Sequence, residues 1–262
     1  MALVSGLILN AFGGGKDIGT IVSNFDWSKC SVRDSHRNEY LQTNLAPAYG
    51  ELTDESIKDL DNSLKIMIAG TLISIGKLTD KSWKSVLSTM MQHPLLVPDS
   101  DEVARADKLI KESSSAFKFD GSPDAQIVRE VKSWFTTLVG DSDVLQQTRI
   151  DIGILAKIVA SSGAAVESFE TFWAKREKHE QTLVEIGVLR FPDRTHPYFK
   201  LYRIKLTAWS DSSRILFHQQ DKNGITGEFN SRKFRPREDV IRDLAPAIHD
   251  NAVKTAESLF SV

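Results

Sequence analysis

The sequence predicts an α+β fold, namely a predominantly helical bundle followed by a small C-terminal antiparallel β-meander and a closing C-terminal helix. An apolar repeat of helical period occupies 141–185 and is the longest such pattern in the chain. Residues 198–234 are instead rich in the aromatic and β-branched side chains that strands prefer. A helical pattern returns after Pro236. We therefore expect three regions, which are an amphipathic N-terminal arm at 1–25, a helical bundle at 26–185, and a β subdomain with the last helix at 186–262.

Two apolar pieces at 3–12 and 18–25 make up the N-terminal arm, with three glycines between them. Consecutive glycines lose too much backbone entropy to remain helical, so they predict a hinge. The arm resembles the apolar, glycine-containing N-terminal segments of some pore-forming proteins. This resemblance implies a toxin-like, membrane-active role in which the arm lies in a membrane interface, whereas the alternative is a terminal helical arm packed on the body.

Helices are predicted along most of 53–140. Thr53 caps the first, which spans 53–76 and contains the uncharged run 66–76; the many isoleucines there leave a strand as the alternative. Further helices are expected at 80–92, 100–117 and 122–140, and Gly140 would close the last of them in the left-handed conformation. The segment 26–52 lacks periodicity and is predicted to be an ordered loop or a short helix.

The central helix of the bundle is expected to span 141–185. A second apolar row beside its main seam widens the stripe beyond that of a two-stranded coiled coil, so this helix should contact several neighbours at once. The residues of the main seam, which recur every seven positions, are Leu145, Ile152, Val159, Val166 and Trp173.

Three or four antiparallel strands are predicted after the bundle. They cover 198–209, 214–220 and 225–234, while 183–191 either continues the helix or begins a strand. Asn223 and Gly224 tolerate positive φ, so 221–224 is predicted to be a hairpin turn. The last helix follows Pro236 and is interrupted at Pro246.

The composition indicates a globular protein, because 41% of the residues are hydrophobic and 26% are charged. Cys30 is the only cysteine, which excludes intrachain disulfides and cysteine-based zinc sites. The apolar N-terminal stretch lacks a basic n-region, and it falls short of the roughly 20 residues that a membrane-spanning helix needs. We therefore expect a soluble protein without a transmembrane segment, in a reducing compartment such as the cytoplasm.

The sequence contains no signature of a known catalytic or cofactor site. Motifs of zinc hydrolases, α/β-hydrolases, dinucleotide-binding folds and P-loops are absent, so we predict no cofactor and no metal. His218 lies about one pairing from Glu228 across the predicted hairpin, where the carboxylate could fix the imidazole tautomer for acid–base catalysis. The alternative function is therefore an enzyme of unrecognised class, with a pocket between bundle and sheet at these two residues.

A basic, aromatic β segment is the main recognition signal. From 190 to 237 there are eleven Lys and Arg against four acids, a net charge of +7, which leaves −9 for the rest of the chain. Aromatic rings beside cations suit lipid headgroups, phosphates or stacked bases, although acids of the same chain could also neutralise the segment. We predict a non-enzymatic binding protein, possible as an oligomer, that recognises anionic lipid or a polyanion. The predicted binding residues are Arg203, Lys205, Trp209, Arg214, Arg232, Lys233, Arg235 and Arg237.

Overall fold

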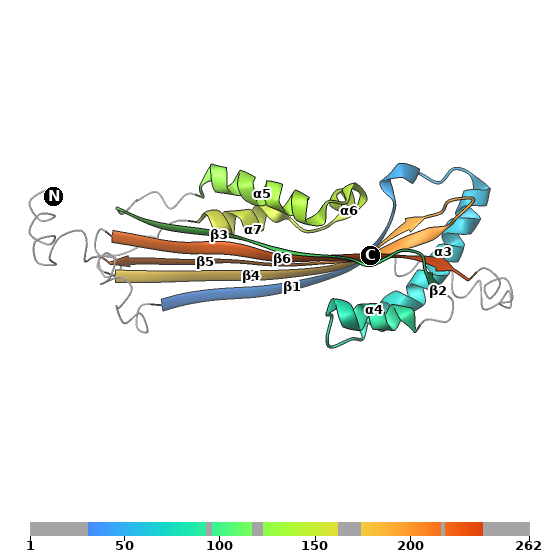
Figure 1. Cartoon of the computed structure of the whole chain (residues 1–262), viewed down its shortest axis with the longest axis horizontal. Coiled ribbons are helices and arrows are strands. Elements are labelled where there is room, and N and C mark those ends of the chain that lie inside the picture. The colour runs from blue at the N-terminus through green and yellow to red at the C-terminus, as the bar shows by residue number, and fades with distance from the viewer. Residues whose placement is uncertain (1–30, 93–95, 117–122, 162–173, 216–217, 238–262) are drawn as a thin grey trace, which may run out of the picture.

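The computed structural model describes residues 31–92, 96–116, 123–161, 174–215 and 218–237. At its centre lies one six-stranded mixed sheet with helices on both sides, which gives the molecule an elongated shape (Figure 1). The predicted N-terminal arm and the predicted C-terminal helix lie outside the described residues.

Five of the six strands are unusually long, with 14 to 19 residues each, so they extend over roughly 45 to 60 Å. The sheet order is β1-β4-β5-β6, and both β2 and β3 pair with the outer side of β6. β1 runs parallel to β4, and all other pairs are antiparallel. The strands are β1 (Ser31–Leu45), β2 (Leu96–Pro98), β3 (Val103–Ala116), β4 (Ala174–Phe191), β5 (Tyr198–Ile215) and β6 (His218–Pro236).

The helices begin at side-chain caps that the sequence supplies. Asp124, Asp141 and Asp151 each accept a backbone N–H in the first turn of the helix that follows, and Ser82 does the same. Gly140 ends its helix with φ of 52°, as predicted. The helical elements are the 3-10 turn η2 (Pro47–Tyr49) and the α-helices α3 (Glu55–Gly76), α4 (Trp83–Met91), α5 (Ala125–Val139), α6 (Ser142–Gln147) and α7 (Ile152–Ala160).

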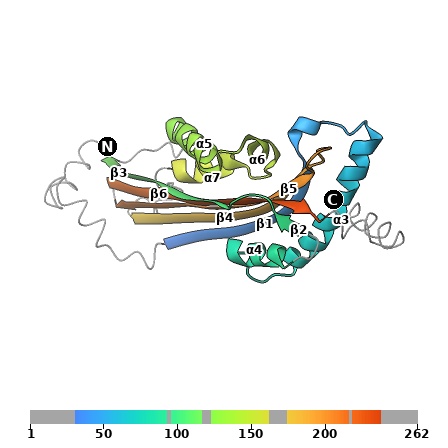
Figure 2. The same ribbon diagram turned by 45° about the vertical axis from the view of Figure 1, so that its right-hand side comes forward.

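The helices divide between the two faces of the sheet. α5, α6 and α7 cover one face, which we call the α5 face, and α3 and α4 pack at one end of the other face, the α4 face (Figures 1 and 2). Because side chains alternate along a strand, the even-numbered residues of β5 and the odd-numbered residues of β4 and β6 belong to the α5 face.

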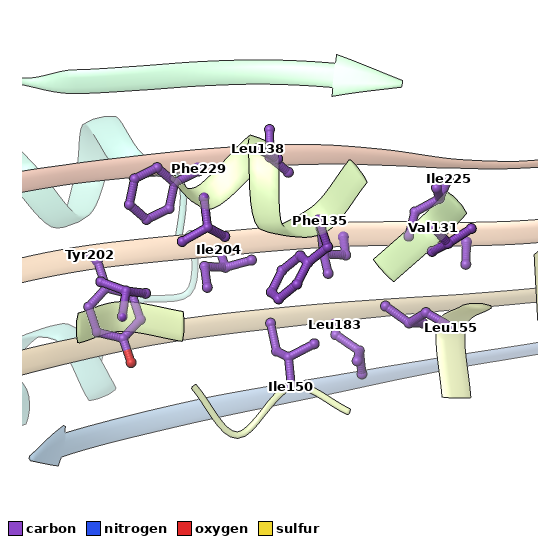
Figure 3. Packing of buried hydrophobic residues seen from close by; sticks show 14 of the residues in the cluster. Val131, Phe135, Leu138, Ile150, Leu155, Leu183, Tyr202, Ile204, Ile225 and Phe229 are labelled. Atoms are coloured by element: carbon purple, nitrogen blue, oxygen red, sulfur yellow. The ribbon is translucent and has the colours of Figure 1, made fainter. Parts of the chain in front are cut away.

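The larger hydrophobic core fills the α5 face. Phe135 and Leu138 of α5 pack on Ile204 of β5 and Phe229 of β6, as Figure 3 shows. Each of these four side chains is at most 4% exposed. Burial of this kind contributes about 1.5 to 3 kcal/mol per large side chain, so this face carries most of the packing energy of the sheet.

A second core lies between α3, α4 and the near end of the α4 face. Phe199 and Phe234 stack there with ring centroids 5.6 Å apart, against Leu64 and Ile68 of α3. No helix among the described residues is both long and apolar enough to cross a membrane.

The predicted helical bundle is wrong, because the described chain consists mainly of sheet. The expected central helix at 141–185 is instead divided into α6, α7 and the first part of β4. The break after α6 has a visible cause: the carboxylate of Glu185 accepts the backbone N–H of Arg149 and the hydroxyl of Thr148, which holds these residues in an extended segment. The heptad pattern therefore joined three elements that are separate.

Two further predictions are wrong, and both concern strands at an edge of the sheet. The expected helix at 100–117 is strand β3, and the expected loop at 26–52 contains strand β1. β1 and β3 lie at opposite edges of the sheet, and almost every described residue of β3 from Val103 to Glu112 is exposed. An edge strand that buries so little shows no alternation of apolar and polar residues, so its sequence lacks the strand signal.

The predicted hairpin at 221–224 is also wrong, since these residues lie inside β6. The strands expected at 198–209 and 225–234 are confirmed, as parts of the longer β5 and β6, whereas the strand expected at 214–220 is wrong, because its residues are divided between the end of β5 and the start of β6. Gly224 serves a different purpose from a turn. A Cβ atom at this position would lie 2.5 Å from Cζ2 of Trp209, so the glycine makes room for the indole on the neighbouring strand.

Candidate anion-binding face

Beyond α4, no described helix covers the α4 face of β3, β4, β5 and β6, whose side chains are partly or fully exposed there, and we call this part the open face. In both views the far half of the sheet has no described helix on this side (Figures 1 and 2). The paired registers place its residues in rows across the four strands. The open face consists of Arg176, Lys178, Glu180 and Thr182 of β4; Lys205, Thr207, Trp209 and Asp211 of β5; Lys222, Gly224, Thr226 and Glu228 of β6; and Lys108, Ile110 and Glu112 of β3.

Trp209 occupies the middle of the open face and is half-buried. Its six-membered ring lies over the backbone of Gly224, in the same row as Ile110, which is 41% exposed. The indole thus packs on the backbone of a residue that has no side chain, and it forms an aromatic surface on a mostly polar part of the sheet.

Around Trp209, two carboxylates each bind two cations. Asp211 accepts hydrogen bonds of 2.7 and 2.5 Å from Arg176, and Lys178 lies 3.3 Å from it. Burial alone would raise the pKa of Asp211, but its bonds to Arg176 and Lys178 outweigh burial and lower it. Asp211 is therefore held ionised between two positive groups.

Glu228 is shared in the same way. Nη1 of Arg203 lies 2.9 Å from this carboxylate and Nζ of Lys205 lies 3.7 Å from it. Burial acts to raise the pKa of Glu228, yet the two cations lower it overall. Because Arg203 also donates its Nε–H to the carbonyl of Lys81, it is fixed at the border of the open face, whereas the Lys205 side chain remains 40% exposed.

The sharing leaves the open face with more positive than negative groups. Lys222 pairs with Glu112 at 2.9 Å, and both side chains are at least 60% exposed. On these four strands, with Arg203 at the border, six cations face four carboxylates. The cations are Arg176, Lys178, Arg203, Lys205, Lys222 and Lys108, and the carboxylates are Glu180, Asp211, Glu228 and Glu112.

The structure separates the predicted binding residues into three places. Arg203, Lys205 and Trp209 lie together at the open face. Arg214 lies on the opposite, α5 face and is fully buried, and this burial lowers its pKa. Its guanidinium is therefore not part of an external binding surface.

The remaining four predicted residues lie at the far end of β6, beside the turn after β2. Arg235 forms an ion pair of 2.5 Å with Asp99, and Arg232 donates to the carbonyl of Ser100 at 3.1 Å. Nζ of Lys233 lies 4.8 Å from the ring centroid of Tyr198, and Arg237 is exposed. Of these four cations, Arg235 is thus neutralised by an acid from outside the basic segment.

Four cations of the open face escaped the sequence argument because their elements were misassigned. Arg176 and Lys178 lie in the expected central helix at 141–185, Lys108 lies in the expected helix at 100–117, and Lys222 lies in the expected hairpin turn. A partial signal was present, because Arg176, Lys178, Glu180 and Thr182 occupy every second position.

The catalytic pair proposed from the sequence does not form. His218 and Glu228 lie on the same strand ten positions apart, which separates them by roughly 33 Å. His218 is paired in register with Ile215, and burial lowers its pKa. The alternative enzyme therefore loses the site on which it was based.

A separate pocket of about 340 Å³ lies between α7 and β4 on the other side of the sheet. Its apolar wall consists of Ile154 and Ile158, and His179 and Gln181 of β4 lie opposite. Among the described residues, no group of three or more His, Cys, Asp or Glu side chains is placed to bind a metal ion. The pocket thus offers a hydrophobic wall with a few polar groups, and no recognisable catalytic set.

Comparisons with known proteins add little to this picture. No family model matches the chain, and no curated protein matches its sequence. Among solved structures, one described as the structure of the Evf virulence factor is similar over 86% of this chain and 80% of its own, with 11% sequence identity and a TM-score of 0.25. A similarity at this level carries no conclusion about the fold or the function of the chain.

Proposed function

We propose that the protein is a non-enzymatic binding protein whose open face binds the phosphate groups of anionic membrane headgroups. The observation that carries the proposal is the arrangement around Trp209, where a partly exposed aromatic ring is surrounded by cations that outnumber their carboxylate partners. Lys205 and Lys178 are the surplus members, since Glu228 and Asp211 each keep an arginine without them.

The exposed ion pairs of this face can be exchanged at low cost. A surface pair contributes only about 0 to 1 kcal/mol, because water screens the charges and the side chains lose entropy. Lys178, Lys205 and Lys222 have side chains 37%, 40% and 64% exposed. They can therefore turn from a shared carboxylate to a lipid phosphate and gain a new charge-assisted hydrogen bond.

The shape and chemistry of the face favour a membrane over a nucleic acid. Single-stranded nucleic acids bind in positively charged grooves with several stacking rings, whereas this face is a four-stranded surface with one tryptophan. Tryptophan is enriched at the membrane interface, where its ring lies among headgroups. Ile110 lies in the same row and adds an exposed apolar group beside it.

Vesicle cosedimentation tests the proposal with a matched pair of variants. The triple variant Lys178→Gln, Lys205→Gln and Lys222→Gln removes three charges from the open face, and Asp211 and Glu228 keep their arginines. The control variant Arg129→Gln, Lys132→Gln and Lys157→Gln removes three exposed charges from α5 and α7, on the other side of the sheet. We expect salt-sensitive binding to vesicles of phosphatidylcholine and phosphatidylserine to be lost in the first variant and retained in the second.

Trp209→Ala separates the aromatic contribution from the charge. We expect it to weaken vesicle binding by about one order of magnitude, since interfacial aromatic contacts are worth roughly 1 to 2 kcal/mol. Binding of the wild type that is equal for vesicles with and without phosphatidylserine, or equal in the two triple variants, would remove the open face as the site. Preferential binding to heparin or single-stranded DNA would show that the anion is a polyanion instead of a membrane.

A further inference from the structure

The outer edge of β3 is an exposed and unpaired side of the sheet. β3 pairs with β6 through fourteen residues, and none of the other described strands pairs with its second side. The residues from Val103 to Lys108 are all exposed, and Val103 and Ile110 are 37% and 41% exposed. A long edge strand with exposed apolar residues is a template for pairing with another strand.

The hydrogen bonds of Lys108 show which backbone groups point outward. Its backbone N–H donates to Oδ1 of Asp107 at 2.8 Å, so this N–H is turned away from β6. Backbone groups of an antiparallel strand alternate in direction, so the even-numbered residues of β3 present their N–H and C=O groups at the outer edge. The side chains of these even-numbered residues belong to the open face.

In one antiparallel register of β3 with the β3 of a second copy, an apolar residue of the open face lies opposite an apolar residue, and a lysine lies opposite a glutamate. When Ile110 lies opposite the Ile110 of the other copy, Lys108 lies opposite Glu112 on each side of the centre. Within the part of the chain that the structure describes, no carboxylate pairs with Lys108. This register would place the two Ile110 side chains in contact at the axis, still on the open face, and flank them with two Lys–Glu pairs.

We propose that a second copy of this chain docks on the outer edge of β3, antiparallel and centred on Ile110. The two sheets then join into one continuous sheet around a twofold axis perpendicular to it. The even-numbered residues of β3 form the new backbone hydrogen bonds, and α5 lies on the other face, where it does not cover them.

The symmetry has a consequence for binding. A twofold axis perpendicular to the sheet leaves the two open faces on the same side of the dimer. Two weak membrane contacts would then act together, and the second binding event becomes intramolecular. The dimer is inferred from β3 alone, so its test is independent of lipid binding.

A charge-swap series measured by sedimentation equilibrium tests the register. In Lys108→Glu, two glutamates face each other at two symmetric places, and we expect the dimer Kd to rise roughly tenfold or more. Glu112→Lys should weaken the dimer similarly, and the double variant Lys108→Glu, Glu112→Lys should recover most of the affinity. Ile110→Lys places two lysines together at the axis and should give a monomer with an unchanged circular dichroism spectrum.

Disulfide trapping in a Cys30→Ser background locates the axis directly. Residue 110 of one copy would lie about 5.5 Å from its counterpart between Cα atoms, within disulfide range, so Ile110→Cys should crosslink on oxidation. Ala106→Cys is the matched control on the same side of the strand, because its copies would be about 27 Å apart and should not crosslink.

The proposal would be overturned by a wild type that stays monomeric up to the highest soluble concentration, by a dimer that Ile110→Lys leaves intact, or by equal crosslinking at 106 and 110. Open-ended assembly beyond a dimer would also contradict it, since a twofold pairing of one edge closes after two copies.

Discussion

The two faces of β5 differ sharply in how far their side chains are buried. On the α5 face, Ile204, Leu206 and Ala208 are fully buried, whereas Lys205 and Thr207 between them are partly exposed on the open face. Both sets belong to one strand with one backbone geometry. The comparison shows that the residues of the α5 face pack against α5 and α7, while the open face carries charged and aromatic residues without such packing.

The carboxylates on the two faces also differ in their burial and in their partners. Glu185 on the α5 face is fully buried and accepts four hydrogen bonds, from Tyr202, Gln42, Thr148 and the backbone of Arg149. Asp211 and Glu228 of the open face instead each pair with an arginine and with a lysine whose side chain is 37% or 40% exposed. A buried carboxylate with all its acceptor positions filled is fixed, and an exposed shared carboxylate can exchange its partner.

The largest expected effect is on the free energy of unfolding. It is a comparison of two alanine substitutions in β6, one on the α5 face and one on the open face. Phe229 is 1% exposed in the core, so Phe229→Ala should lower the free energy of unfolding by about 3 to 5 kcal/mol. Thr226→Ala changes an exposed side chain on the open face and should change it by about 0.5 kcal/mol or less. Urea denaturation of both variants measures the difference. Similar losses in the two variants would mean that the open face is packed in the folded protein.

The second effect is smaller and depends on pH. Glu185→Gln replaces a carboxylate that accepts from four donors by an amide with one acceptor oxygen, so some donors lose their partner. The expected cost is about 1 to 3 kcal/mol at neutral pH. Conservative substitution of an open-face acid, Glu112→Gln, is the control, and it should have almost no effect because the side chain is 60% exposed.

The pH dependence follows from the direction of the pKa shift. Burial raises the pKa of Glu185 above its usual 4.5, although its four hydrogen bonds act in the opposite direction. A carboxyl group with a raised pKa in the folded state binds its proton more tightly when folded, so its contribution to stability is complete below pH 4.5 and is lost as the pH rises through the folded pKa. The stability of the wild type relative to Glu185→Gln should therefore fall as the pH rises above 4.5. A difference that is constant or that grows with pH would contradict this.

The sequence was sufficient for elements that carry their own local signal. α3, α4 and α5 were predicted from caps and apolar spacing, and β5 and β6 from aromatic and β-branched residues. It was insufficient for β1, β3 and the first part of β4, because these strands contain many charged residues and owe their conformation to pairing with strands distant in the chain. Such pairings leave no local pattern.

The residues of the open face were predictable only in part, for the same reason. Arg203, Lys205 and Trp209 were found because they lie in a recognised strand, and Arg176 and Lys178 were missed because theirs was assigned to a helix. Arg214 was included because composition does not show which face a side chain belongs to, and one residue of register decides that.

The smallest predicted effect compares the two faces across a single edge strand. Arg105 lies on the α5 face of β3, where its guanidinium donates to the carbonyls of Leu138 and Val139 at the C-terminal end of α5 and lies 5.7 Å from the ring centroid of Phe229. A cation at this end of a helix satisfies free carbonyls and the helix dipole, so Arg105→Ala should cost about 1 kcal/mol. Lys108→Ala, three residues further along the same strand and on the open face, should leave the unfolding free energy of the monomer unchanged. Thermal unfolding at low protein concentration, where a dimer would be dissociated, measures both variants. An equal loss of unfolding free energy in the two would mean that Lys108 on the open face stabilises β3 as much as the contact of Arg105 with α5 does.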